Sequence, residues 1–176
     1  TLQSLGAKTT LVSGPTSLAE PNVEQVIKVN SADQMLEACE SSLPADIAVC
    51  AAAVADYKIA NKEITKIKKD GSRQNMILEE NPDILERLSK RNHLRPKLVV
   101  GFAAETSNLE RNSNEKLNKK GCDWVLGNNV SENSIFNQDT NKIYFTSKLY
   151  SENWELMTKK EVAKKLCQKI SLHLNN

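Results

Sequence analysis

The stretch Asp46-Ile47-Ala48-Val49-Cys50-Ala51-Ala52-Ala53-Val54 is a continuous run of small and apolar residues. Such a run is typical of a β-strand that is buried on both faces, as the strands of a parallel sheet are. Similar runs occupy residues 97–102 and 124–126, and patterns of helical period separate the three runs. This alternation predicts an α/β, Rossmann-like fold with a mainly parallel sheet flanked by helices.

Capping signals mark the start of each predicted helix. The predicted N-caps, in chain order, are Ser31 with Gln34 three residues on, Asn81 with Pro82 as the first helical residue, Thr106 or Ser107, and Thr158 with Glu161 three residues on. Short strands are predicted over residues 9–13, 25–29 and 142–146. The last of these is expected to pair with residues near 154–157 as a small β-ribbon.

Length and charge narrow the class of protein. The chain has 176 residues and a formal net charge of +2, which fits one domain without the basic excess of a nucleic-acid binder. Its uncharged apolar stretches are too short to span a membrane. The four cysteines are widely spaced and show no Cys-x-x-Cys pair, so we expect free thiols in the cytoplasm rather than disulfides or a zinc site.

Two segments could carry chemistry next to the first buried run. Ala51, Ala52 and Ala53 leave a strand end without bulk, where a flat ligand could lie with Asp56 beside it. The alternative is a helix packed tightly on small residues. Lys66 and Lys68 share one face of an extended segment before the turn Asp70-Gly71, which suits contact with a phosphate or oxyanion. The alternative there is a solvated basic edge strand.

Three more candidates follow the later runs. Phe102 offers either a flat face for a base or a core side chain, and Gly101 beside it permits close backbone approach. Lys116 and Lys120 share a helix face, which suits either an anion or solvent. The pair Asn128-Asn129 could contact polar ligand edges or form a turn. Because parallel sheets bind ligands at the carboxyl ends of their strands, these segments predict one shared site.

Several common enzyme classes lose support. The six glycines form neither G-x-G-x-x-G nor G-x-x-x-x-G-K-[ST], and the chain contains no G-x-S-x-G or H-E-x-x-H. These absences argue against a dinucleotide oxidoreductase, a P-loop kinase and a serine hydrolase. A different cofactor-binding α/β enzyme and a non-catalytic nucleotide-binding or dimer-assembly module stay open.

The ordered set of motifs closely resembles the phosphopantothenoylcysteine synthetase domain over essentially the whole chain, residues 1–176. The motifs are Cys50 to Tyr57, Lys66-Ile67-Lys68-Lys69, Asn81-Pro82-Asp83-Ile84-Leu85, Gly101 to Thr106, Glu115-Lys116-Leu117 and Asn128-x-Val130-Ser131. In bacteria this domain is usually the C-terminal half of a bifunctional protein with a flavin-dependent decarboxylase, so FMN is expected only if that half exists in the parent protein.

The resemblance implies a two-step ligation in coenzyme A biosynthesis. CTP activates the carboxylate of 4′-phosphopantothenate as an acyl-cytidylate, and the amine of cysteine then displaces CMP. Magnesium, CTP and a homodimer are the expected cofactor, co-substrate and assembly, with neither nucleic acid nor membrane as a partner.

The resemblance also implies roles for individual residues. Lys66 matches the reactive-site lysine, and Asp56 matches a nucleotide-site acid, expected either near the triphosphate and its magnesium or near the ribose. The residues matched to nucleotide contacts are Cys50, Ala51, Ala52, Asp56, Lys66, Glu79, Glu80, Asn81, Pro82, Phe102, Lys116 and Lys120. The family's opening strand and its N-x-S-S-G-K-M-G helix start do not occur here, which predicts that the first strand is missing from this chain and that catalysis by the chain alone is impaired.

Overall fold

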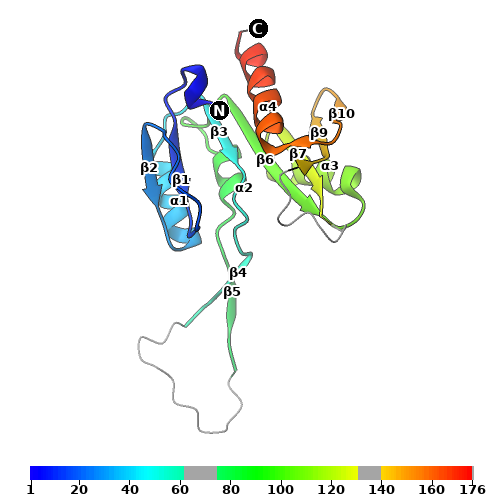
Figure 1. The fold of residues 1–176 in the computed structure, drawn as a ribbon. Helices are drawn as coiled ribbons and strands as arrows, with labels where there is room; N and C mark the ends of the chain where they lie inside the picture. Colours follow the sequence, from blue (N-terminus) through cyan, green and yellow to red (C-terminus); the bar gives the residue numbers. More distant parts are fainter. Residues whose placement is uncertain (62–74, 131–139, 176) are drawn as a thin grey trace.

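The computed structural model of the chain describes residues 1–61, 75–130 and 140–175, and its centre is a five-stranded sheet (Figure 1). The strand order is β10-β9-β7-β6-β3. Three neighbouring strands run parallel, and two antiparallel strands follow at one side. The strands are β3 (Ile47–Cys50), β6 (Leu98–Glu105), β7 (Trp124–Asn129), β9 (Ile143–Ser147) and β10 (Ser151–Asn153). The predicted α/β class is confirmed.

Three two-stranded sheets accompany the main sheet. They are the parallel pair β1 (Thr10–Ser13) and β2 (Gln25–Lys28), the antiparallel pair β4 (Tyr57–Ile59) and β5 (Leu78–Glu80), and the antiparallel pair β8 (Thr140–Asn141) and β11 (Met157–Thr158). Over the described residues, β1 pairs along one edge with β2, and β3 pairs along one edge with β6. A missing first strand, as the sequence predicts, would leave such edges open, and its absence from this chain stays a prediction.

Helices cover both faces of the main sheet (Figure 1). One face packs against α4 (Lys159–Leu174), and the other packs against α2 (Ile84–Ser89) and α3 (Leu109–Lys120). The alternation along β6 builds both cores, because Leu98 and Val100 point toward α4 whereas Val99 and Ala103 point toward α2 and α3. A third cluster joins β1, β2 and α1 (Ala32–Ser41) to α2. A short 3-10 helix, η1 (Gln3–Leu5), precedes β1.

Two of the predicted helix caps are confirmed. The Ser31 side chain accepts a hydrogen bond from the Gln34 amide, and Thr158 and Glu161 form a complete capping box. The last helix buries one face of Val162, Leu166 and Ile170, each at 5% exposure or less. In the part of the chain that the structure describes, no helix is long and apolar enough to cross a membrane.

Two of the predicted caps are wrong. Asp83, not Asn81, caps α2, and its side chain accepts a hydrogen bond from the Glu86 amide. Neither Thr106 nor Ser107 caps α3, because that helix starts after Asn108, which adopts a left-handed conformation with φ of 50°. An asparagine tolerates this conformation better than most residues, so the chain can turn sharply there before the helix.

Two strand predictions also need correction. The run 46–54 forms a strand only over β3, which lies at one edge of the main sheet, and Val49 is 37% exposed rather than buried. Residues 142–146 do pair antiparallel with the segment before Met157, as predicted, because Tyr144 pairs with Asn153 and the Trp154 amide donates a 2.8 Å hydrogen bond to the Ile143 carbonyl. The correction concerns position: β9 lies inside the main sheet between β7 and β10 rather than in a separate ribbon, and Phe145 is fully buried.

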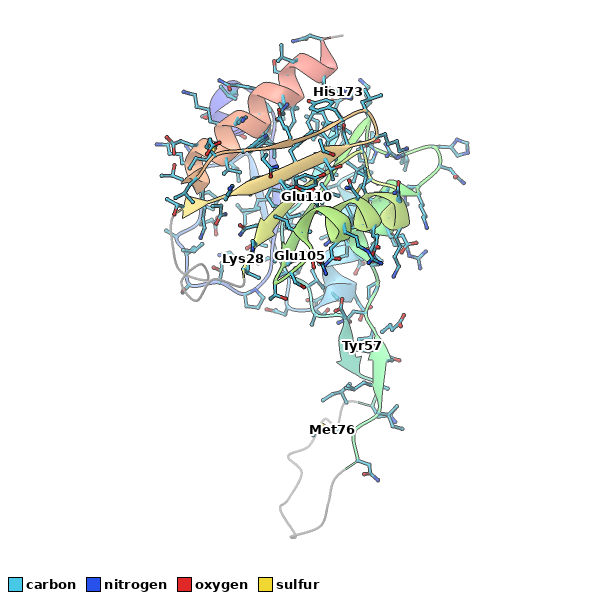
Figure 2. The ribbon with its side chains drawn as sticks, turned by 90° about the vertical axis from the view of Figure 1, so that its right-hand side faces the viewer. Lys28, Tyr57, Met76, Glu105, Glu110 and His173 are labelled. Atoms are coloured by element: carbon cyan, nitrogen blue, oxygen red, sulfur yellow. The ribbon has the colours of Figure 1, made fainter. Side chains whose placement is uncertain are left out.

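A separate ribbon, β4–β5, projects away from the body of the molecule (Figures 1 and 2). Tyr57 lies near its base and Met76 farther out, as Figure 2 shows. Its described apolar side chains are exposed, from Ile59 at 41% to Met76 at 68%. The ribbon flanks residues 62–74, so Lys66 and the predicted turn Asp70-Gly71 lie outside the described residues.

Candidate functional site

Most of the predicted nucleotide contacts lie around the carboxyl end of β3, which is next to the middle of β6. Cys50, the last residue of β3, is the register partner of Gly101 in β6, so Ala51 follows directly beside Phe102. The Asn81 amide donates a 2.8 Å hydrogen bond to the Asp56 carbonyl, which joins the segment after β3 to the segment after β5. The sequence-predicted edge for ligand binding is thus the edge where these residues lie.

The three alanines after β3 are exposed rather than packed. Ala51, Ala52 and Ala53 all lie at the surface, and so does Asp56. The alternative of a helix packed tightly on these small residues is therefore wrong. Their backbone can be approached closely by a flat ligand, because no side chain beyond Cβ stands in the way.

Asn81 holds the two segments of this edge in place. Its side-chain amide donates a 2.9 Å hydrogen bond to the Ala55 carbonyl, in addition to the main-chain bond that its amide makes with Asp56. Asn81 thus acts as a clamp between residues 55–56 and Pro82, rather than as a helix cap. This role orients the segment that carries Asp56.

Lys116 and Lys120 project from one face of α3 toward this edge. Lys116 Nζ donates a 2.7 Å hydrogen bond to the Phe102 carbonyl, and Lys120 forms an ion pair with Asp83. The hydrogen bond to Asp83 raises the pKa of Lys120, although partial burial opposes that shift. Both side chains are therefore partly buried cations at the sheet edge, and the alternative of a fully solvated face is wrong.

Asp83 is the functional candidate that our sequence reasoning missed. Its carboxylate both caps α2 and pairs with Lys120. Burial tends to raise the pKa of Asp83, but hydrogen bonds from Lys120 and the Glu86 amide, with the nearby charges, lower it overall. The spacing Asp83-x-x-Glu86 was the available signal, because it satisfies the capping pattern as well as Asn81 does.

The residues around Phe102 have structural roles as well. The Phe102 side chain is half-buried and packs against the core on the α4 face, which agrees with its alternative as a core residue. A Cβ on Gly101 would lie 2.6 Å from Leu85 Cδ2. The close approach at Gly101 is therefore made by α2, which rests directly on β6.

Cys50 is a poor candidate for a nucleophile. Burial raises the pKa of its thiol to about 12, with smaller contributions from Cys39, Cys122 and Asp83. A thiol with that pKa is almost entirely protonated at neutral pH. All four cysteines are free, so the expectation of free thiols is confirmed.

The acids of β5 face different surroundings. Glu79 lies 3.6 Å from Lys58 Nζ across the β4–β5 ribbon. The charge of Glu79 therefore already has a partner within the protein. Glu80 is exposed and is the register partner of Tyr57. Both residues lie at the base of the ribbon beside the candidate site.

Asn128 and Asn129 lie at the end of β7, so the alternative of a turn is wrong. They pair in register with Ala104 and Glu105 of β6. The amide oxygen of Asn128 is buried, with no hydrogen-bond partner within the described residues. Both residues border the same edge of the sheet, one strand farther from Ala51.

A magnesium site made by the protein alone is not found. Over residues 1–61, 75–130 and 140–175, no group of three or more His, Cys, Asp or Glu side chains could hold a metal ion. Magnesium is often bound by one or two carboxylates together with substrate phosphates. The exposed carboxylate of Asp56 fits that mode of binding.

Comparison with known proteins decides the family. Residues 1–173 match the DNA/pantothenate metabolism flavoprotein C-terminal domain. The chain belongs to this family. The resemblance that the motifs indicate is thereby confirmed over nearly the full chain.

Solved and curated relatives agree with this assignment. The chain is 37% identical over 166 residues to the coenzyme A biosynthesis bifunctional protein CoaBC of Haemophilus influenzae, covering 94% of this chain and 41% of that protein. It is 36% identical over 171 residues to a cysteine/cysteine sulfinic acid decarboxylase from an unknown prokaryotic organism, covering 95% of this chain and 47% of that protein. The crystal structure of the C-terminal domain of a CoaBC protein has a TM-score of 0.79 and 31% identity, covering 99% of this chain and 78% of that one. The chain therefore spans less than half the length of these curated relatives.

Proposed function

We propose that this family member acts in coenzyme A biosynthesis as a CTP-dependent phosphopantothenate–cysteine ligase. The observation that carries the proposal is the pair of lysines, Lys116 and Lys120, that α3 directs toward the uncovered strand end at Ala51. Cations beside an accessible backbone suit a nucleoside triphosphate, because they offset phosphate charge while the backbone contacts a base or sugar. The relatives named for coenzyme A biosynthesis point to the same pathway.

The proposed reaction has two steps. A carboxylate oxygen of 4′-phosphopantothenate attacks the α-phosphorus of CTP, so that a C–O–P linkage forms, the α–β P–O bond breaks and pyrophosphate leaves. The amine of cysteine then attacks the acyl carbon, the acyl C–O bond breaks, CMP leaves and the amine proton passes to solvent. Activation is needed because a free carboxylate is a poor electrophile.

Each residue of the site has a proposed role in this scheme. Lys116 and Lys120 offset the charge of the bound phosphates, and the backbone of residues 50–52 borders the nucleotide. Asn81 holds the segment of Asp56, whose carboxylate would bind magnesium through the triphosphate. Magnesium would supply Lewis-acid stabilisation of phosphate charge. Lys66 is proposed as the catalytic lysine on the family resemblance alone, since it lies outside the described residues.

Partners and setting follow from the same proposal. The substrates are CTP, 4′-phosphopantothenate and cysteine, and the assembly is a homodimer in the cytoplasm. FMN belongs to the proposal only if a decarboxylase half exists in the parent protein. Neither nucleic acid nor a membrane is a proposed partner.

Nucleotide choice gives the first test. Thermal unfolding of the 176-residue chain should show a larger increase in melting temperature with CTP and magnesium than with ATP and magnesium. Equal shifts with all four nucleoside triphosphates would show that the site does not select the base. The absence of any shift would favour an assembly module that binds no nucleotide.

Lys66 gives the second test. In a chain with a complete N-terminus, Lys66→Gln should lower turnover by about two to three orders of magnitude, the range for losing one preorganised electrostatic donor, while CTP affinity falls much less. Lys69→Gln is the control, because alternation would turn Lys69 to the opposite face if the segment is extended, as the sequence predicts. Equal losses in both variants would contradict a transition-state role for Lys66.

A further inference from the structure

The base of the β4–β5 ribbon is attached to the body by one lysine. Lys58, the central residue of β4, forms an ion pair of 2.6 Å with Asp33 in the first turn of α1. The same ammonium lies 3.6 Å from Glu79, its register partner in β5. Lys58 is therefore the point at which both strands of the ribbon and a helix of the body meet.

The Lys58–Asp33 ion pair should affect the direction in which the β4–β5 ribbon leaves the body more than it affects the free energy of unfolding. The Lys58 side chain is only 24% exposed, whereas that of Asp33 is 56% exposed. Exposed ion pairs contribute little to global stability. A two-stranded ribbon is also only marginally stable in water on its own, so a single contact at its base can decide how it leaves the body.

The two residues at which the ribbon joins the body belong to the candidate site. Asp56 immediately precedes β4 and Asn81 immediately follows β5. The hydrogen bond from the Asn81 amide to the Asp56 carbonyl closes the ribbon at this point. A change in the direction of the ribbon therefore moves both residues relative to Ala51 and Lys116.

We infer that Lys58 is a positioning residue, which fixes the β4–β5 ribbon against α1 through Asp33 and thereby sets Asp56 and Asn81 for nucleotide binding. The nucleotide in this inference rests on the proposed function, whereas the ion pair between Lys58 and Asp33 does not. It requires that the charge of Lys58, and not merely its bulk, holds the ribbon. Asp33 is the necessary partner, because Glu79 moves together with the ribbon.

Hydrogen exchange tests the contact without reference to activity. Lys58→Met and Asp33→Asn should each speed exchange of the Ala60 and Asn81 amides by about two- to fivefold, the effect on local opening of losing one partly exposed ion pair. Lys58→Arg should restore protection because it restores the charge. Lys97→Met is the matched control, since it removes a 2.9 Å ion pair with Asp46 at the amino end of β6.

Kinetics of the same variants test the consequence for the site. In a chain with a complete N-terminus, Lys58→Met should raise the KM for CTP about three- to tenfold, with kcat within about twofold, because binding groups are displaced while reacting groups are not. Lys97→Met should leave both values unchanged. Absence of CTP binding by the wild-type chain would refute the proposed nucleotide site, whereas the exchange rates would still test the Lys58–Asp33 contact.

Three results would overturn the inference. Unchanged exchange of Ala60 and Asn81 in Lys58→Met would show that the ion pair does not hold the ribbon. Equal acceleration in Lys97→Met would show a global effect rather than a local one. A fall in kcat with an unchanged KM would place Lys58 in the chemical step, not in positioning.

Discussion

Lys116 Nζ donates a 2.7 Å hydrogen bond to the main-chain carbonyl of Phe102, which ties α3 to the carboxyl-terminal part of β6. This bond holds the ammonium at the edge of the sheet beside Ala51, where the proposed nucleotide lies. A ligand phosphate would therefore find a cation that is already oriented. Preorganisation of this kind reduces the entropy lost on binding.

Removing that ammonium should weaken nucleotide binding. Lys116→Met is expected to raise the Kd for CTP by about 10- to 100-fold, which corresponds to losing one charge-assisted hydrogen bond. Isothermal titration calorimetry measures the change. Lys119→Met is the matched control, because Lys119 is exposed and lies in the same turn of α3. Similar losses in both variants would attribute the effect to net charge instead.

The charge of Asp83 should stabilise the fold in a pH-dependent way. Because its folded pKa is lowered, the stabilising contribution is present above the ordinary carboxyl pKa of 3.8 and is lost as the pH falls through the folded value. Asp83→Asn should therefore unfold at a lower temperature than wild type at pH 7. The difference should shrink as the pH is lowered from about 4 toward 3. A difference that stays constant over this range would contradict the role of the charge.

A second substitution separates the two roles of Asp83. Asn is a good N-cap, so Asp83→Asn keeps the cap of α2 while it removes the ion pair with Lys120. Asp83→Ala removes both and should cost about 0.5–2 kcal/mol more at pH 7. Chemical denaturation of the two variants measures that difference.

The folded chain should resist alkylation of its thiols. Burial raises the pKa of Cys50 to about 12 and that of Cys122 to about 11. At pH 8 the Cys50 thiol is therefore almost entirely protonated, whereas the thiolate is the reactive form. Iodoacetamide should label these two residues slowly in the native chain and fully in urea, as peptide mass spectrometry can show. Rapid native labelling of Cys50 would contradict its assignment as an inert structural thiol.

Gly127 and Ser113 should be coupled in stability. A Cβ at Gly127 would lie 2.2 Å from Ser113 Oγ, and that hydroxyl is buried without a hydrogen-bond partner within the described residues. Gly127→Ala is expected to destabilise the chain by about 1–3 kcal/mol. Adding Ser113→Ala should recover part of this loss, because it removes the clashing atom. Strictly additive effects in the double-mutant cycle would refute the contact.

Hydrophobic patterning was enough to predict the strands that lie at the centre of the sheet. Residues 97–102 and 124–126 form β6 and β7 as predicted, since burial on both faces leaves a continuous apolar run. The run 46–54 looks the same but ends at Cys50 as a strand. Its remaining alanines are exposed at the sheet edge, and small apolar residues do not distinguish a buried strand from an uncovered strand end.

The site was predictable only in part, because its contacts join segments that are distant in sequence. Motif resemblance found Lys116 and Lys120, but not that Lys120 pairs with Asp83. It found Asn81, but as a cap rather than as a clamp on Ala55 and Asp56. Local capping patterns could not choose between Asn81 and Asp83, and the choice depends on how the ribbon closes.

The β4–β5 ribbon places the fold and the proposed chemistry under separate evolutionary constraints. Its described apolar residues, such as Ile59 and Leu78, are exposed and belong to none of the three core clusters. Substitutions along the ribbon should therefore leave folding intact while they change how a ligand is held. A lineage could alter its substrate preference there without first acquiring extra stability elsewhere, which core-lined binding sites rarely allow.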